Sequence, residues 1–122
     1  MQRENELIED KQIGIDIVDI GRFRKKNFVK NESFYKKIFT DLEIKYCRGF
    51  SDPYPHFAGK FALKEAVQKS IQENMIFKKI ETFHINSRPV IKIEDHEKKY
   101  AIIASISHEK RYAIAIAISK KN

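Results

Sequence analysis

The longest helical pattern in the chain lies at residues 57–69 and reads FAGKFALKEAVQK. On a helical wheel at about 100° per residue, its apolar residues cover a broad arc that contains Phe57, Ala58, Phe61, Ala62, Leu63, Ala66 and Val67. Lys60 and Lys64 share a narrow polar stripe on the remaining side. Glu65 lies outside that stripe, between Phe61 and the alanines, on the face predicted to turn toward the core.

Helix-start signals stand on the N-terminal side of this pattern. Ser51-Asp52-Pro53 precedes the long helix, which we expect to run from about His56 to Glu73. A shorter helix is predicted through residues 42–46, because Thr40 and Glu43 have the spacing of a capping box.

The N-terminal part combines a polar stretch with an apolar strand. Residues 1–11 are polar and charged, and we expect an N-terminal extension there. Residues 13–18 are apolar and β-branched, which predicts a buried strand that one carboxylate, Asp16, interrupts. A basic, partly amphipathic helix is expected over residues 19–30.

Strand patterns follow the long helix. Strands are predicted at about residues 80–86 and 90–94, and a hairpin at 100–107 and 111–119. The last strand alternates alanine and isoleucine, so we expect it to be covered on both faces, the alanine side allowing close approach of a helix or another subunit. The order of strand, helices and strands predicts a single α+β domain over residues 12–122, with one long central helix and a closing antiparallel hairpin.

Asp16 and Glu65 are two carboxylates in apolar surroundings. An isolated ionised carboxylate is costly there, so it is paired, protonated or given a cation. Two of them on separate central elements suggest a shared divalent ion with oxygen ligands. Mg²⁺ fits best, because it keeps several waters and completes its shell with substrate phosphates. Ordinary salt bridges to Lys64, Lys69 or an arginine are the alternative.

The composition limits the classes of function. The net charge is +7, from 24 basic and 17 acidic residues, which favours an anionic partner. The lysines form no dedicated basic arm and no RNA-binding motif, so we expect no nucleic-acid partner. The single cysteine, Cys47, allows no internal disulfide. No run approaches the roughly 20 apolar residues that span a bilayer. We therefore expect a soluble, cytoplasmic protein without a membrane partner.

Three blocks of the sequence together match the pattern of one family. They are residues 13–20 with Arg22, residues 57–66 followed by Lys69, and Ser105-Ile106-Ser107-His108 with Tyr112-Ala113. In this order, and across nearly the whole chain, they resemble the opening signature, central helix and closing hairpin of the holo-acyl-carrier-protein synthases. These are the short, homotrimeric bacterial members of the 4'-phosphopantetheinyl transferase superfamily.

The resemblance implies a reaction and a site. The reaction is transfer of 4'-phosphopantetheine from coenzyme A to a serine of an apo-acyl carrier protein, with release of adenosine 3',5'-bisphosphate. Asp16 and Glu65 are the implied Mg²⁺ ligands and, with Lys69, the implied catalytic residues. The base that takes the serine proton stays open between Glu65 and a metal-held water. Coenzyme A is implied to lie between subunits of a homotrimer.

The resemblance also implies binding residues. Lys64, Lys69, Ser107 and His108 are expected to contact coenzyme A. Arg22 matches a position that faces the carrier protein, and Arg24 and Lys25 extend the same positive surface. Because carrier proteins are acidic, complementary charge would speed the encounter and fix the orientation of the partners.

The chain departs from the family pattern in three places. Members commonly have glycines directly after the central helix, where this chain has residues 70–74 without glycine. Ser87 stands where the usual turn has glycine, and Lys60 replaces a frequent arginine. The missing glycines are the best support for an alternative, a degenerate non-catalytic protein that binds coenzyme A or a carrier. The presence of Asp16, Glu65, Lys69 and His108 together argues against it. Another magnesium phosphotransferase and a nucleic-acid-binding domain are weaker alternatives.

Overall fold

The computed structural model describes residues 9–96 and 98–122. Of the expected extension at residues 1–11, residues 1–8 lie outside the described residues, and Lys11 already belongs to the first strand. The elements are β1 (Lys11–Asp19), α2 (Gly21–Arg24), α3 (Glu32–Ile38), α4 (Asp41–Arg48), α5 (Tyr54–Ile71), the 3-10 turn η1 (Phe77–Lys79), β2 (Ile80–Ile85), β3 (Arg88–Ile93), β4 (Tyr100–His108) and β5 (Tyr112–Lys121).

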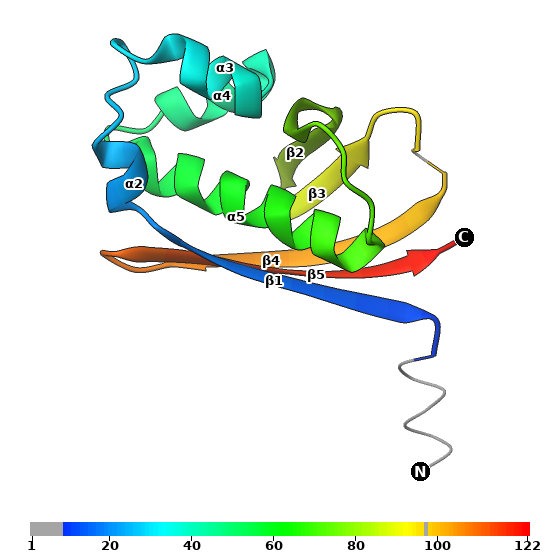
Figure 1. Ribbon diagram of the computed structural model, residues 1–122. Coiled ribbons are helices and arrows are strands. Elements are labelled where there is room, and N and C mark those ends of the chain that lie inside the picture. Colours follow the sequence, from blue (N-terminus) through cyan, green and yellow to red (C-terminus); the bar gives the residue numbers. More distant parts are fainter. Residues whose placement is uncertain (1–8, 97) are drawn as a thin grey trace.

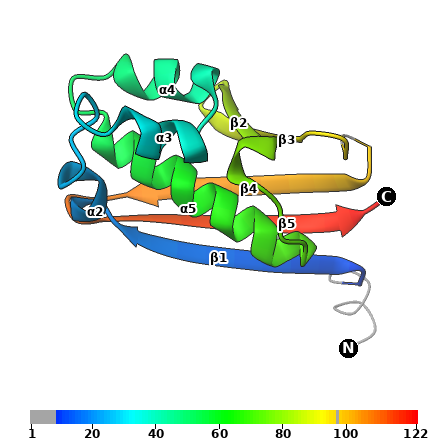
Figure 2. The ribbon, with the colours of Figure 1, turned by 45° about the horizontal axis from the view of Figure 1, so that its top comes forward.

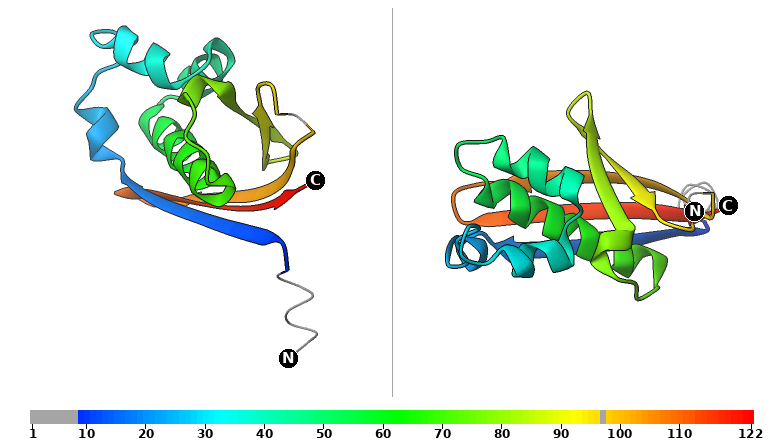
Figure 3. Two further views of the ribbon diagram at one scale, coloured as in Figure 1. Left: turned by 45° about the vertical axis from the view of Figure 1, so that its right-hand side comes forward. Right: turned by 90° about the horizontal axis from the view of Figure 1, so that it is seen from above.

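The strands form two antiparallel sheets. The larger has the order β1-β5-β4, and the smaller is the hairpin β2-β3. Helix α5 lies lengthwise on one face of the larger sheet, with α3 and α4 on the far side of α5 (Figures 1 and 2). The hairpin β2-β3 stands beside α5 and meets β4 (Figure 3). The predicted α+β fold, with its long central helix and closing hairpin, is confirmed.

The basic helix expected over residues 19–30 is wrong, because only Gly21–Arg24 is helical there. Phe23 and Phe28 are both buried. On one continuous helix, residues five positions apart would point about 140° away from each other, so one ring would leave the core. The chain instead ends α2 after Arg24 and buries both rings, with Phe28 stacked on Phe57 at a centroid distance of 6.0 Å.

Helix α4 begins with the predicted capping box. The Glu43 backbone N–H donates to the Thr40 hydroxyl at 3.3 Å, and the Thr40 N–H donates to Glu43 Oε1 at 2.8 Å. Unlike most capping residues, Glu43 is buried. Its second carboxylate oxygen accepts hydrogen bonds from the Thr82 N–H at 3.0 Å and the Thr82 hydroxyl at 2.6 Å. The cap of α4 therefore reaches across the core to β2.

Two lysines of α5 complete this buried polar network. Lys64 Nζ donates to Glu43 Oε1 at 2.6 Å and to the carbonyls of Ile38 and Phe77 at 2.9 Å each. Lys60 Nζ donates to the carbonyl and the hydroxyl of Thr82 at 3.0 and 2.8 Å. The polar stripe predicted for these two lysines is wrong, since both side chains are buried. Helix α5 is enclosed by the sheet below and by α3, α4 and β2 above.

One face of the larger sheet stays open. The alanines of β5 are buried against α5, as the pattern predicts, but the isoleucines on the opposite face are exposed. Strand β1 presents its isoleucines to the same open face, so the expectation of a strand covered on both sides is wrong within one chain. The isoleucines with 36–69% exposure on this face are Ile13, Ile15, Ile17, Ile103, Ile114 and Ile116.

Left-handed residues replace the glycines that the family pattern would supply. Gln72 ends α5 with φ of 57°. The turn between β2 and β3 has Asn86 and Ser87 at φ of 51° and 66°. Positive φ at both central residues is the geometry of a two-residue hairpin turn. Both turns therefore keep a backbone that glycine would adopt more readily.

Gly14 lets β1 approach α5 closely. A Cβ at this position would lie 1.9 Å from the Ala66 carbonyl oxygen and 2.8 Å from the Ser70 nitrogen. Because both contacts are backbone atoms, neither can rotate away. The contact sets the height of β1 on the helix, and so the position of every inward residue of that strand.

We expect Gly14→Ala to lower the free energy of unfolding by about 3 kcal/mol, since the added methyl must push β1 off α5. Urea denaturation measures the change. Gly49→Ala is the matched control, because a Cβ there meets its nearest atom at 3.3 Å in an exposed position, and it should change stability by less than about 0.5 kcal/mol. Equal stability of the two variants would contradict the close-approach argument.

Candidate active site

Strand β1 and helix α5 bring Asp16, Glu65 and Lys69 together. Asp16 points toward α5 because it lies two residues after Gly14 on the inward face of the strand. Lys69 Nζ donates to Asp16 Oδ1 at 3.2 Å and to the Ile15 carbonyl at 3.0 Å. The Asp16 side chain is 16% exposed and that of Lys69 is 53% exposed, so the cluster opens to solvent on the lysine side.

The Asp16 and Glu65 carboxylates place two negative charges close together where β1 contacts α5. Burial raises the pKa of Glu65, and the charge of Asp16 raises it further, while Lys69 and Arg22 act in the opposite direction. Within the described residues Asp16 pairs with Lys69, whereas Glu65 has no ion pair. The salt-bridge alternative therefore accounts for Asp16 alone, and Glu65 keeps its lone pairs for a cation or a proton.

The donor set fits Mg²⁺. In the part of the chain that the structure describes, no group of three His, Cys, Asp or Glu residues is gathered for a metal ion. A site of two carboxylates leaves the remaining positions to water and substrate oxygens, and Mg²⁺ commonly binds in this way. A surface depression lies beside the C-terminal part of α5, next to Glu65. Its lining residues are Glu65, Gln68, Lys69, Gln72, Glu73 and Asn74.

His108 belongs to a separate pocket on the other side of α5. It lies at the end of β4 near the first turn of α5, where it meets His56 at a ring-centroid distance of 5.8 Å. The lining residues of this pocket are Tyr46, Pro55, His56, Gly59, Lys60, His84, Ile106 and His108. Three imidazoles and one ammonium group thus face a common space.

Aromatic stacking positions two of these imidazoles. The His84 ring stacks on Tyr46 at 4.6 Å, and the His56 ring stacks on Phe50 at 3.6 Å. Burial lowers the pKa of both His56 and His84, and the neighbouring charge of Lys60 lowers both further. His84 Nδ1 is buried and has no hydrogen-bond partner among the described residues. Burial therefore favours the uncharged form of His56 and His84, and His84 keeps an unused ring nitrogen.

A single chain does not join the two pockets. Asp16 lies on edge strand β1 and His108 on edge strand β4, with β5 between them. Ser107 and His108 are neighbours in a strand and so point to opposite faces of the sheet. Ser107 faces the open isoleucine side, whereas His108 faces α5.

Lys64 is the one expected site residue that the structure contradicts. Its side chain is fully buried, and its three hydrogen bonds to Glu43, Ile38 and Phe77 use all three ammonium protons. It has neither exposure nor a free donor for a coenzyme A phosphate. Burial lowers the pKa of Lys64, while the Glu43 carboxylate raises it.

The expected carrier-docking residues all lie at the start of the helical layer. Arg22 is exposed, and its guanidinium lies 4.9 Å from the centre of the Phe61 ring. Lys25 is also exposed. Arg24 makes a two-pronged contact with Asp52, with N–O distances of 3.0 and 2.8 Å. Arg22 and Lys25 therefore offer the more available positive charge.

Sequence reasoning did not assign Glu43, His56 and His84 to any site. The sequence predicted Glu43 only as part of a helix cap. Its ion pair with Lys64 joins residues that are 21 positions apart in the chain. The two histidines are 28 residues apart and carry no motif. Only the packing of β2 against α5 brings them to one pocket.

The chain is similar in sequence to known proteins. The family model of the 4'-phosphopantetheinyl transferase superfamily matches residues 12–117. A holo-[acyl-carrier-protein] synthase of Thermodesulfovibrio yellowstonii is 40% identical over 103 residues, covering 74% of this chain and 91% of that protein. One of Chlamydia pneumoniae is 39% identical over 88 residues, covering 69% of this chain and 72% of that protein.

Solved structures show the same fold. A holo-[acyl-carrier-protein] synthase from Helicobacter pylori, in complex with coenzyme A, has a TM-score of 0.78 at 31% identity over 88% of this chain and 99% of that one. A holo-(acyl-carrier-protein) synthase from Bacillus anthracis, in complex with CoA (3',5'-ADP), has a TM-score of 0.78 at 26% identity over 91% of this chain and 96% of that one. This chain, with its paired carboxylates at the junction of β1 and α5, belongs to the 4'-phosphopantetheinyl transferase superfamily.

Proposed function

We propose that this chain is a phosphopantetheinyl transferase that moves 4'-phosphopantetheine from coenzyme A to a serine of an apo-acyl carrier protein. Adenosine 3',5'-bisphosphate is the second product. The observation that carries the proposal is the Asp16–Glu65–Lys69 cluster, which couples two carboxylates and an exposed ammonium group in a member of this superfamily. The named relatives and the coenzyme A complexes support the choice of substrates.

The chemistry requires positioning and charge neutralisation more than covalent help. The serine oxygen forms a bond to the phosphorus that carries the pantetheine, and the bond from that phosphorus to the bridging oxygen breaks. Lys69 donates hydrogen bonds to the diphosphate, because its ammonium group is exposed beside Asp16. Glu65, or a water beside it, takes the serine proton, and burial favours this by raising the pKa of Glu65.

Asp16 and Glu65 would hold Mg²⁺. When bound, the ion neutralises negative charge on the diphosphate oxygens. The two side chains come from different elements that Gly14 holds in close contact, so their separation does not depend on a mobile loop.

The functional assay is the mass of an intact apo-acyl carrier protein after incubation with the chain, coenzyme A and Mg²⁺. We expect a gain of one phosphopantetheine, lost with EDTA, restored by excess Mg²⁺ and absent from a carrier whose acceptor serine is alanine. Coenzyme A binding without transfer to any of several carriers would favour the degenerate binding protein and overturn the proposal.

The active unit in this proposal is a homotrimer with interfacial sites. The open isoleucine face is large and apolar for a lone subunit, and such faces mark interaction surfaces. Asp16 and His108 lie on opposite edges of the sheet, so subunits that meet on this face can bring the Asp16 cluster of one chain near the His108 pocket of another. Coenzyme A then spans the two.

We expect Ile15→Glu to convert the trimer into monomers, because a buried unpaired charge is costly at an interface. Light scattering after size exclusion measures the mass, which should fall from three times that of the chain to one. Val29→Glu is the control, since Val29 is 69% exposed and lies outside the sheet, and it should stay trimeric. A monomeric wild-type chain with full activity would exclude the interfacial site.

Arg22 and Lys25 form the carrier-docking surface in this proposal. We expect Arg22→Glu with Lys25→Glu to raise KM for an acidic carrier by about tenfold or more while kcat changes little, because rim charges act on the encounter. Steady-state kinetics at low and high salt measure this effect. Lys120→Glu with Lys121→Glu, two exposed substitutions on β5, is the charge-matched control. An unchanged KM would place docking elsewhere.

The compartment in this proposal is the cytoplasm. The one cysteine, Cys47, is buried and free, as is usual in reducing compartments. Within the described residues, no helix is long and apolar enough to cross a membrane.

A further inference from the structure

The segment after α5 forms one wall of the candidate active site. Gln72, Glu73 and Asn74 line the same depression as Glu65 and Lys69. The residues from Glu73 to Ile76 adopt no helix or strand. A wall built from such a segment depends on side-chain contacts to keep its position.

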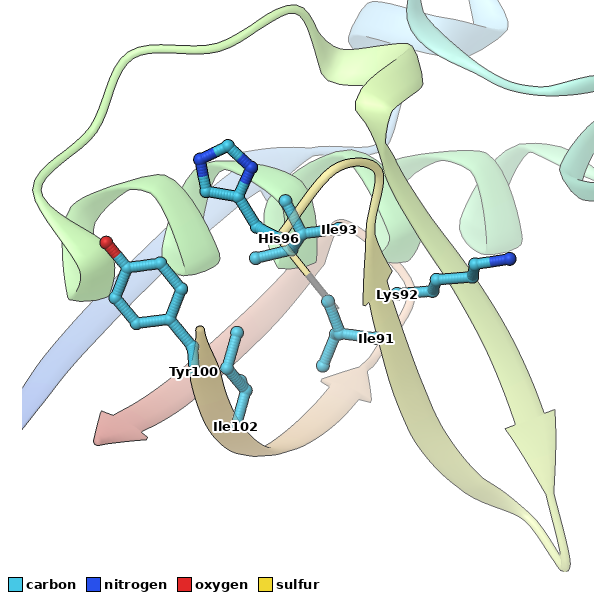
Figure 4. A pocket seen from close by; sticks show the side chains of 6 residues that line it. All are labelled: Ile91, Lys92, Ile93, His96, Tyr100 and Ile102. Atoms are coloured by element: carbon cyan, nitrogen blue, oxygen red, sulfur yellow. The ribbon is translucent and has the colours of Figure 1, made fainter. Parts of the chain in front are cut away.

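Glu73 supplies the contacts that reach another element. Its Oε2 accepts hydrogen bonds from the Tyr100 hydroxyl and, at 3.3 Å, from Lys99 Nζ. His96 Nε2 lies 3.7 Å from its other carboxylate oxygen. These partners stand in or beside the turn from β3 to β4, more than twenty residues away in sequence. Figure 4 shows the Tyr100 and His96 side chains on the side of this turn that faces the end of α5.

Two further contacts hold the same segment from the side of α5. Gln68 Nε2 donates to the Met75 carbonyl at 2.5 Å, and Gln72 Nε2 donates to Gln12 Oε1 of β1 at 3.3 Å. The segment is therefore tied to the helix, to β1 and, through Glu73, to β4. Of these ties, only the one through Glu73 is charged, and it engages two donors at once.

We propose that Glu73 is a positioning residue for the transfer reaction, which fixes the wall beside Glu65 and Lys69 through Tyr100 and Lys99. This inference rests on the proposed function. Where family members commonly have glycine-rich backbone, this chain has a left-handed Gln72 followed by an anchored carboxylate. The contacts of Glu73 with Tyr100 and Lys99 hold residues 72–74 at the wall of the depression, so that coenzyme A can enter it. Without these contacts the segment would not keep this position.

The test compares Glu73→Ala and Tyr100→Phe with the control Glu94→Ala, an exposed glutamate in the turn directly after β3. We expect each test variant to raise KM for coenzyme A by about tenfold, with kcat within about threefold of wild type. The double variant should be no worse than Glu73→Ala alone, because both changes remove one contact. Backbone amides of residues 73–76 should exchange hydrogen about tenfold faster.

A merely structural role gives a different pattern. A lower melting temperature, with an unchanged KM and unchanged amide exchange in the folded protein, would overturn the inference, as would additive effects in the double variant. Glu73→Gln is the conservative variant, and because it keeps an acceptor for Tyr100 it should recover most of the affinity for coenzyme A. Failure to recover would also count against the anchor.

The test stays decisive if the proposed function fails. Should the wild-type chain modify no carrier, the dissociation constant of coenzyme A, measured by calorimetry, replaces KM. Binding that is about tenfold weaker in Glu73→Ala and Tyr100→Phe than in Glu94→Ala would support the anchor. Equal binding in all variants, or no binding by wild type, would overturn it.

Discussion

Replacing Lys64 by methionine will lower the free energy of unfolding by about 4 kcal/mol, because it leaves the Glu43 carboxylate buried without its cation. The Ile38 and Phe77 carbonyls lose their donor in the same step. An unpaired buried charge is among the few defects that reach this size. Urea denaturation followed by circular dichroism measures the change.

Two further variants show whether the charge causes the effect. Lys69→Met removes an equivalent side chain that is 53% exposed, and it should cost less than about 1 kcal/mol. Lys64→Met combined with Glu43→Gln should recover part of the loss, since the uncompensated charge is gone. If Lys64→Met kept full stability but bound coenzyme A weakly, the buried network would be the wrong description and the phosphate contact the right one.

Asp16→Asn and Glu65→Gln will each reduce the rate of phosphopantetheine transfer by a factor of about 1,000 or more. Such a loss corresponds to about 4 kcal/mol of transition-state stabilisation. The fold should persist, because removing one of two neighbouring negative charges relieves their repulsion, which adds to burial in raising the pKa of Glu65. Initial rates from the intact mass of the carrier measure the loss at saturating coenzyme A.

Metal binding provides an independent reading of the same pair. Mg²⁺ should raise the melting temperature of the wild-type chain, since an ion bound only by the folded state stabilises it. The rise should disappear in both variants and persist in Asp41→Asn, an exposed carboxylate on α4. Variants that lost activity but kept the full Mg²⁺ response would place the metal elsewhere.

Local patterns in the sequence were enough to predict most of the fold. Alternation along β5, the capping box of Thr40 and Glu43, and the apolar arc of α5 each report on residues a few positions apart. The helix expected over residues 19–30 failed for a tertiary reason. Phe28 stacks on Phe57, and this contact outweighs the helical preference of the basic residues around it.

The site residues that could be predicted from sequence are those whose charge does not suit the apolar strand or helix in which they lie. Asp16 and Glu65 stand out because each is a carboxylate among apolar neighbours. Lys64 misled the prediction, since a lysine on a helix is usually solvated, and its partner Glu43 comes from another helix. Glu73 gives no sequence signal at all, because its meaning depends on Tyr100 reaching back from β4.

The lysines of α5 also decide how the helix is oriented about its own axis. A helix that is apolar on nearly every side could rotate about its axis at little cost in free energy, since one hydrophobic contact replaces another. Lys60 and Lys64, one turn apart, fix the rotation of the helix. Rotation in either direction would break the hydrogen bonds of both ammonium groups to Thr82 and Glu43. Glu65 follows Lys64 directly, so the direction of the Glu65 side chain toward β1 is already fixed in the folded protein before substrate binds.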